Sequence, residues 1–355
     1  MKKFLLKVSI FAAFAFVIQV ILPIWIDPFN VFHAENIRFQ GGDPNKNYVK
    51  MKYILANPGK FDSFLFGSSR VGAIHTENIT GERCYNMTLS TGLPGWHLLN
   101  IKTMFENGIY PKKIYIGVDT VSYTGDYEKQ INDPMRCPYE YLRHDIIHFA
   151  ELYFTGTIVM HSLKTVLHVL PEENTTFSRE IFYEYGWEFS YEREIRNYDW
   201  NNPQDFSPSK HPLLYYGSPD KQDIDCTLNI IKEIKDICYK HDTELIFFTN
   251  PMHRIAYLLS VRNKDYFTFL DGLAEISDFW NFSSLNDITT DNANYFETSH
   301  YRANVGDILI NVMCSGKSYP ELNAQGFGVK VTRENAKDFI SMLRRQIEDY
   351  EKSQQ

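Results

Sequence analysis

The sequence predicts an α/β protein with a mainly parallel sheet in a three-layer α/β/α sandwich, and two observations indicate this. Short apolar runs bounded by turn residues recur at 62–66, 83–87, 113–118 and 244–249, as expected for buried strands. An amphipathic stretch at 224–238 has apolar residues at helical spacing and leads directly into the fourth run. A crossover helix between parallel strands has this form.

Composition limits the class of protein. The chain has 355 residues, 44% of them hydrophobic, so it can bury one large core or two small ones. The net charge of -8 and the scattered Lys and Arg residues argue against a nucleic-acid partner. The five cysteines show no CxxC pair and are odd in number, which favours free thiols over a disulfide framework or a zinc knuckle.

The N-terminus predicts a membrane anchor. After Lys2, Lys3 and Lys7, residues 8–26 carry no charge, and this run is long enough to cross a bilayer. A signal peptide is the alternative, but its apolar region is shorter and no small-x-small cleavage site follows the run. We therefore expect residues 1–30 to be an uncleaved single-pass anchor. The lysines before it place residues 31–355 outside the cytoplasm.

Two further elements complete the expected order. A fifth strand is predicted at 279–282, and a helix is expected after His300 through 308–312. Residues 122–218 do not fit the strand–helix rhythm and are rich in aromatic side chains. We expect a mainly helical insertion there, over the carboxyl edge of the sheet, where open α/β sheets bind ligands. Its aromatic side chains suit a carbohydrate, although ordinary packing explains any single one of them.

Two distant segments supply the groups of a serine-dependent catalyst. The apolar run at 64–66 ends in Gly-Ser-Ser-Arg at 67–70, as a buried strand ends when it delivers a side chain to the sheet edge. Near the other end of the chain, Glu297 precedes His300 by three residues, close enough for the acid to orient the imidazole. If the fold joins the two segments, they form a nucleophile, its base and the orienter of the base.

The order of five motifs resembles the SGNH/GDSL hydrolase superfamily. These are Gly-Ser-Ser at 67–69, Tyr-Asn-Met-Thr-Leu-Ser-Thr-Gly at 85–92, Ile-Tyr-Ile-Gly-Val-Asp at 114–119, Asn-Pro-Met-His at 250–253 and Glu-Thr-Ser-His-Tyr-Arg at 297–302. The chain is most similar to the membrane-anchored branch that modifies cell envelopes, as in alginate O-acetylation and teichoic acid D-alanylation. The resemblance covers residues 60–125 and 240–315, and each motif alone is weak.

The resemblance implies a role for each matching position. Ser69 stands where the superfamily has its nucleophile, with its neighbour Ser68 as the alternative. His300 becomes the general base and Glu297 the residue that holds its second nitrogen. The superfamily usually has Asp at this last position. Glu is one methylene longer, so the loop or the rotamer must adjust.

The implied oxyanion and substrate groups match less well. Gly92 and the backbone at Ser69 and Arg70 are the expected donors, the last two at a helix N-terminus. Asp119 stands where the superfamily has an Asn, and an ionised carboxylate accepts hydrogen bonds but cannot donate them. It either orients an acceptor hydroxyl or caps a turn with Thr120 and Ser122. Two other residues, Asn250 and His253, follow a strand and are expected near the pocket.

One rival motif suggests zinc. His144 and His148 are four residues apart with Asp145 between them, which is similar to His-Glu-x-x-His. The shorter acid and the absence of an obvious third ligand favour a surface or pocket-lining histidine pair. We expect neither a metal nor a cofactor.

Three functions remain open. The first is an extracytoplasmic acyltransferase, most simply an O-acetyltransferase, which uses Ser69 to acylate a surface polysaccharide or related envelope polymer. The membrane and a polytopic membrane acyltransferase are its expected partners. The second is an esterase or deacetylase with the same triad and water as acceptor. The third is a non-catalytic envelope-assembly protein, with Glu297 and Asp119 as signs of lost activity.

Overall fold

The computed structural model describes residues 1–34, 44–167, 179–188, 206, 221–263 and 265–353. The chain forms two compact units, and each is described by itself. The first comprises residues 1–57 and 126–179, and the second comprises residues 58–125 and 180–355. Residues 168–178, 189–205 and 207–218 of the expected insertion lie outside the described residues.

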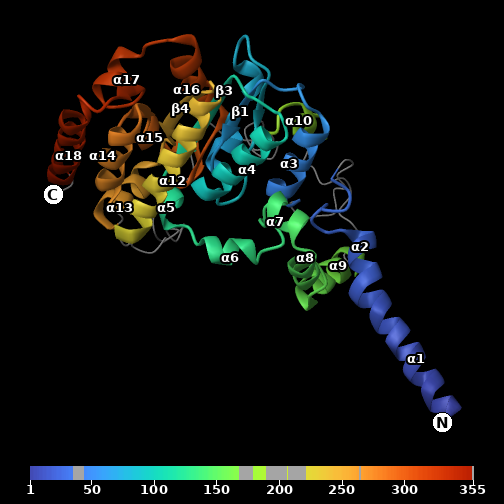
Figure 1. The fold of residues 1–355 in the computed structure, drawn as a ribbon. Helices are drawn as coiled ribbons and strands as arrows, with labels where there is room; N and C mark the ends of the chain where they lie inside the picture. The colour runs from blue at the N-terminus through green and yellow to red at the C-terminus, as the bar shows by residue number, and fades with distance from the viewer. Residues whose placement is uncertain (35–43, 168–178, 189–205, 207–220, 264, 354–355) are drawn as a thin grey trace. The chain divides into compact units, whose positions relative to one another are not determined.

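A six-stranded sheet forms the centre of the second unit (Figure 1). The strands lie in the order β2-β1-β3-β4-β5-β8, the first five parallel and β8 antiparallel to β5. The α/β class and the mostly parallel sheet are therefore confirmed, and the five expected strands are present, while β8 was not expected. The strands are β1 (Ser63–Phe66), β2 (Cys84–Asn86), β3 (Lys113–Val118), β4 (Glu244–Thr249), β5 (Phe279–Asn281) and β8 (Val329–Val331).

Side chains alternate between the two faces of this sheet, and both faces are covered by helices. Leu65, Tyr115 and Phe248 pack in one apolar cluster with residues of α16 (Ala303–Ser315). On the other face, Phe66 meets His97 of α4 (Pro94–Glu106), with ring centroids 5.5 Å apart. Helix α12 (Lys221–Lys240), the expected crossover helix, contacts α4 and α14 (Tyr266–Ile276) on that side (Figure 1).

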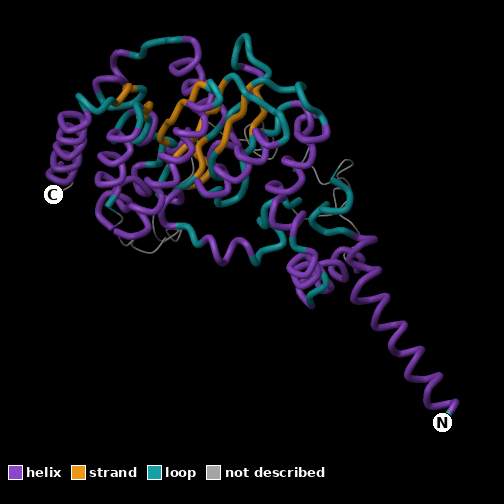
Figure 2. The backbone as a smooth tube through the Cα atoms, viewed as in Figure 1, coloured by secondary structure: helices purple, strands orange, loops and turns teal. Residues whose placement is uncertain are grey.

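Short elements connect the ends of the strands (Figure 2). After β1, where the sequence predicts a helix N-terminus at Ser69 and Arg70, the chain forms a five-residue 3-10 helix, η2 (Ser69–Ala73). A small antiparallel ribbon of β6 (Tyr295–Glu297) and β7 (His300–Tyr301) stands apart from the main sheet. Further helices, some of them longer, are η3 (Thr76–Asn78), α5 (Val121–Thr124), α10 (Arg179–Glu184), α13 (Arg254–Asn263), α15 (Asp287–Thr290), η4 (Asn292–Asn294), α17 (Pro320–Ala324) and α18 (Ala336–Ser353).

The first unit begins with one continuous helix, Lys2–Ile26, which is long and apolar enough to cross a membrane. It consists of α1 (Lys2–Phe16), a π-helical turn η1 (Val17–Ile21) and α2 (Leu22–Ile26). Pro23 has no N–H for the carbonyl four residues earlier, and the wider turn just before it adapts the backbone. The Leu22 N–H accordingly donates to the carbonyl of Val17, five residues back.

All other described elements of the first unit are helices, including those in the described part of the expected insertion. They bury a separate small core that includes Phe29, Leu142 and Tyr153. These helices are α3 (Lys46–Ala56), α6 (Tyr127–Ile131), α7 (Tyr139–His144), α8 (Ile146–Tyr153) and α9 (Gly156–Leu167).

Candidate catalytic site

The candidate site lies at the carboxyl ends of β1, β3 and β4. The chain runs from β1 to β2 on one side and then returns to β3 on the other side of β1. Such a reversal is a topological switch point, where open α/β sheets place their ligands. Ser69 follows β1, Asp119 follows β3 and Asn250 follows β4, so the sheet order brings these three residues to one edge.

Ser69 and His300 are in direct contact. The Ser69 Oγ lies 2.7 Å from Nε2 of His300, although 231 residues separate them in sequence. Ser69 is the first residue of η2 and is half-buried, and the His300 side chain is 23% exposed. The serine and its potential base are therefore both partly exposed.

Glu297 holds the other side of the imidazole. Its Oε1 contacts Nδ1 of His300, and its Oε2 accepts the N–H of Ser299 at 2.7 Å. Glu297 and His300 are paired across the β6–β7 ribbon, next to a register shift between Tyr295 and Glu297. A glutamate at this position thus reaches the imidazole ring.

The pKa of Glu297 lies below its ordinary value of 4.5. Burial raises this pKa, but the hydrogen bond and charge of His300, the Ser299 N–H and the charge of Arg70 lower it further than burial raises it. The carboxylate is consequently ionised at neutral pH, when it can stabilise an imidazolium that forms as Ser69 loses its proton.

Ser68 faces away from this pair. It is 3% exposed, and its Oγ donates to Oδ2 of Asp119 at 2.9 Å. Its carbonyl accepts the Thr88 hydroxyl at 3.0 Å. Of the two adjacent serines, the geometry therefore favours Ser69 as the nucleophile.

Asp119 is a buried anchor between loops. It is 1% exposed, and its Oδ1 accepts the Val121 N–H at 2.8 Å while its own N–H donates to the Ser122 hydroxyl at 3.1 Å. Its Oδ2 accepts from Asn250 Nδ2 at 3.0 Å as well as from Ser68. These contacts agree with the expected turn cap, and a role for Asp119 in orienting an acceptor hydroxyl stays a prediction.

Arg70 joins this anchor to the histidine ribbon. Its Nη1 lies 2.8 Å from Oδ1 of Asp119, while Nε and Nη2 donate to the carbonyl and hydroxyl of Ser299 at 2.9 and 2.8 Å. Ser299 lies between Glu297 and His300, so one guanidinium ties the turn of the ribbon to the end of β3. The sequence predicted a role for the backbone N–H of Arg70 at the site. The structure shows that the Arg70 side chain also bonds to residues of the site.

We expect the Arg70–Asp119 pair to stabilise the second unit strongly. Both side chains are at most 3% exposed. Arg70→Met leaves a buried carboxylate without its counter-charge, which should lower the free energy of unfolding by about 3–5 kcal/mol. Urea unfolding of the detergent-solubilised chain, followed by tryptophan fluorescence, measures this difference.

The matched control is the exposed pair Lys330–Asp278, whose atoms are 3.1 Å apart and whose side chains are about half exposed. Lys330→Met should cost at most about 1 kcal/mol. Equal effects of the two substitutions would show that Arg70 does not hold the site together.

Asn250 bridges the anchor and the residue after the histidine. Besides donating to Asp119, it accepts the Tyr301 hydroxyl on its Oδ1 at 3.0 Å. It is fully buried, and its expected role near the pocket stays a prediction.

Gly92 lies directly against the strand end that carries the serine. A Cβ at this position would lie 2.4 Å from the carbonyl oxygen of Gly67, so only glycine permits the approach. The Gly92 N–H donates to the carbonyl of Leu89 at 3.1 Å and is thereby engaged in a turn. The role of oxyanion donor stays a prediction for Gly92.

His253 lies in packed surroundings. Its Nε2 is 2.9 Å from Oδ1 of Asn292, and its ring centroid lies 5.2 Å from Phe206 and 5.1 Å from Tyr295. It is 0% exposed, and burial lowers its pKa from 6.5 to about 4. These contacts describe a neutral core histidine, and its expected contact with substrate stays a prediction.

The buried His253 should make folding stability depend on acidity. Its folded pKa of about 4 is below the unfolded value of 6.5, so the unfolded chain binds more protons between these values. Stability falls as pH decreases through this window, by about 2 kcal/mol at pH 5 for this group. His253→Gln should flatten the fall, which urea unfolding at pH 7.5 and pH 5 measures. An unchanged slope would contradict the assignment.

The zinc-like motif is divided between two helices. His144 is the last residue of α7, and His148 lies in α8, whose first turn is capped by the Asp145 carboxylate. The two imidazoles therefore do not share one helical face, and His144 instead contacts Glu140 at 2.7 Å. Among the residues that the structure describes, no group of three potential metal ligands comes together.

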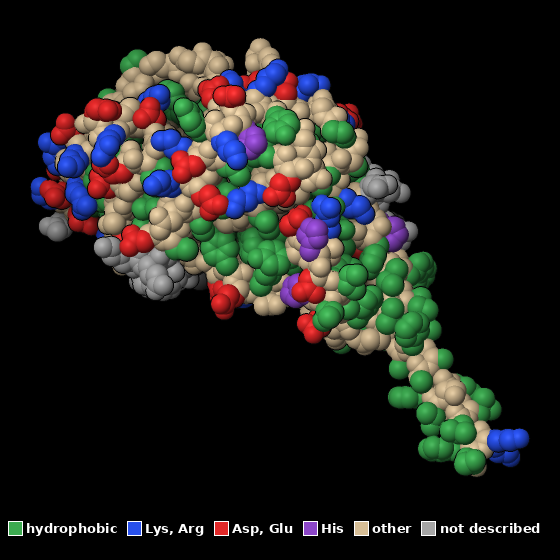
Figure 3. All heavy atoms as spheres, in the orientation of Figure 1, with side chains coloured by type: hydrophobic (Ala, Val, Ile, Leu, Met, Phe, Trp, Pro, Cys, Tyr) green, Lys and Arg blue, Asp and Glu red, His purple; other side chains and the backbone are tan. Residues whose placement is uncertain are grey.

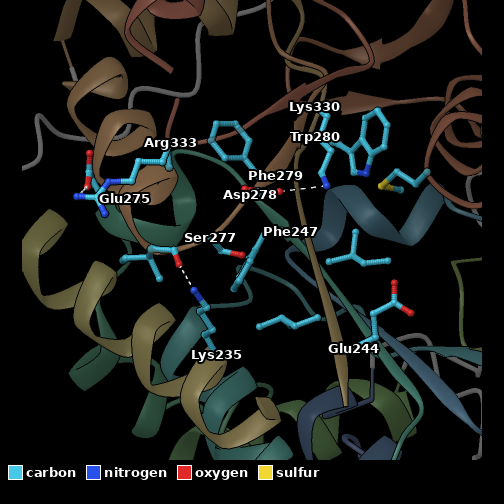
Figure 4. Close-up of a pocket in the computed structure, with 15 residues that line it drawn as sticks. Lys235, Glu244, Phe247, Glu275, Ser277, Asp278, Phe279, Trp280, Lys330 and Arg333 are labelled. Carbon is cyan, nitrogen blue, oxygen red and sulfur yellow. Dashed lines mark hydrogen bonds and ion pairs between the residues drawn. The ribbon is translucent and has the colours of Figure 1, made fainter. Parts of the chain in front are cut away.

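A hollow of about 670 Å³ lies at the opposite edge of the sheet (Figure 4). It is lined by the first residues of β4 and β5, including Glu244 and Phe279, whereas the triad is at the carboxyl ends. Charged side chains at its rim form ion pairs, such as Arg333 with Glu275 at 2.8 Å. This hollow is therefore separate from the catalytic geometry.

No protein-family model matches the chain, and a search of curated proteins finds no relative.

Proposed function

We propose that the protein is a serine-dependent acyltransferase of the cell envelope, with an SGNH-like three-layer α/β/α fold. One observation carries this proposal: the Ser69 hydroxyl, the His300 imidazole and the Glu297 carboxylate are in consecutive contact at the switch point of a parallel sheet. The position of Ser69 directly after β1 agrees with the motif order on which the resemblance to this superfamily rests.

The reaction has two steps that share the base. In the first, Oγ of Ser69 attacks the acyl carbonyl of the donor while Nε2 of His300 takes its proton. The imidazolium then gives that proton to the leaving group, and an acyl ester remains on Ser69. In the second, His300 takes the proton of an acceptor hydroxyl, the hydroxyl oxygen attacks the ester, and Oγ of Ser69 regains a proton.

The acceptor we propose is a hydroxyl of an envelope polysaccharide or related polymer, and the acyl group is most simply acetyl. The helix Lys2–Ile26 supports this choice, because a single-pass anchor would hold residues 31–355 beside a polymer that is assembled at the membrane. A polytopic membrane acyltransferase is the proposed supplier of acyl groups. In this view the chain is bacterial and the catalytic unit lies outside the cytoplasm.

Hydrolysis is the second candidate, because the half-buried Ser69 is also open to water. A chromogenic acetyl ester, offered with and without an acetyl-free oligosaccharide, separates the two. Transfer predicts an acetylated oligosaccharide, detected by mass spectrometry, that is absent from the Ser69→Ala variant. Acetate as the sole product at high oligosaccharide concentration would instead identify an esterase.

A further inference from the structure

Helix α9 carries apolar side chains on two faces. Ile158 and Val159 are buried in the core of the first unit, whereas Met160 and Leu167 are 53% and 74% exposed. Leu163, between them at helical spacing, is half-buried. A surface helix normally has one apolar stripe, and a helix that is apolar all round is covered on its second side as well.

The beginning of α8 extends this apolar surface. Ile146 and Ile147 are adjacent and are 79% and 72% exposed. Figure 3 shows hydrophobic side chains gathered over α8 and α9 and along α1. We define the apolar platform as Ile146, Ile147, Met160, Leu163, Val166 and Leu167. Contiguous patches of this kind mark surfaces that meet another apolar phase.

The platform is fixed to the membrane-crossing helix. Helix α9 packs against both α2 and the π-helical turn η1. The Gln19 side-chain amide, which belongs to that turn, donates to the carbonyl of Phe154 at the end of α8. The junction of α8 and α9 is therefore bonded to a residue inside the apolar run.

The depth of this contact follows from the length of the helix. Gln19 is twelve residues after Lys7, the last charge before the apolar run, which corresponds to about 18 Å along the axis. The hydrocarbon core of a bilayer is about 30 Å thick, so Gln19 lies beyond its midplane. Helix α9, packed against residues 17–26, then reaches the distal leaflet.

We infer that α8 and α9 form a second membrane-binding element, with the apolar platform immersed in the distal leaflet beside the single span. The inference requires that Lys2–Ile26 crosses the bilayer, and it is independent of the proposed chemistry. Lipid is the occupant because the platform continues the lipid-facing surface of the span. Lys164, on α9, is long enough to place its ammonium among the headgroups.

Depth-dependent quenching on the full chain tests this inference. In a background without the exposed Cys226 and the half-buried Cys314, single cysteines at Ile147, Met160 or Leu167 are labelled with an environment-sensitive dye. The chain is placed in phosphatidylethanolamine–phosphatidylglycerol vesicles. Phe11→Cys, within the span, is the lipid control, and Tyr239→Cys, 85% exposed on α12, is the aqueous control.

Labels on the platform should resemble the Phe11 label: quenched severalfold more by nitroxides on lipid chains, and less by iodide, than the Tyr239 label. If they resemble Tyr239 while Phe11 is quenched by lipid, the inference is wrong although the span stands. Labels that neither lipid nitroxides nor iodide quench would show that protein, and not lipid, covers the platform, and would also overturn the inference.

A measurement on the unsubstituted chain guards against perturbation by the labels. A photoreactive lipid chain should modify peptides within 146–167 as well as within 2–26. Modification confined to 2–26 would overturn the inference.

Discussion

Ser69→Ala should reduce turnover of a chromogenic acetyl ester to the background rate, a fall on the order of 10⁶ for a serine triad. The Ser69 Oγ is the oxygen in contact with Nε2 of His300, and its removal leaves the base nothing to activate. His300→Ala should have a loss of the same order, and the double variant should lose no more than either single one, because the two groups act as a unit.

Ser68→Ala is the matched control, because it removes a hydroxyl one residue away. Its Oγ contacts Asp119, so the variant should lose about 1 kcal/mol of stability and keep its activity within about tenfold. Activity that survives Ser69→Ala but not Ser68→Ala would reverse the assignment of the nucleophile.

Glu297→Gln should lower turnover by about 10⁴ while leaving the fold intact. The Ser299 N–H donates to one carboxylate oxygen and therefore requires an acceptor at that position. Glutamine must then direct its carbonyl to Ser299 and its NH₂ to Nδ1 of His300, which makes Nδ1 an acceptor and leaves the proton on Nε2. An Nε2 that already carries a proton cannot take the one from Ser69.

Glu297→Asp separates this tautomer effect from simple loss of contact. This variant keeps a carboxylate and has the Asp that the SGNH/GDSL superfamily usually carries at this position. We therefore expect turnover to fall about tenfold and the tautomer of His300 to stay the same. Circular dichroism and urea unfolding should be the same for both variants. A Glu297→Gln enzyme as active as the Asp variant would show that the acid does not orient His300.

The sequence predicts the strands well because they are buried on both faces. Runs such as 114–118 are continuously apolar and can be recognised in the sequence without knowledge of the strands that pair with them. The sequence does not predict strand β8, because this strand has only three residues. Two of them, Val329 and Lys330, are at least partly exposed. Such a segment has no apolar run and is defined by its pairing with β5.

In the candidate site too, features marked by a local sequence pattern could be predicted, and contacts between distant segments could not. Ser69 and His300 could be paired from the sequence, since a strand end and an acid-x-x-His turn are local patterns. The contacts of the Arg70 side chain with Asp119 and Ser299 could not, because they join three segments distant in sequence. The sequence analysis also did not predict that the zinc-like motif is divided between two helices, although Asp145 before an apolar helix is an N-cap pattern.

The most direct test of the central claim is covalent labelling by a fluorophosphonate, with the labelled residue located by mass spectrometry. A working triad predicts one adduct, on Ser69, that is retained in Ser68→Ala and lost in Ser69→Ala and His300→Ala. Folded protein that takes up no label, or an adduct on another serine, would contradict the assignment of Ser69 as the nucleophile.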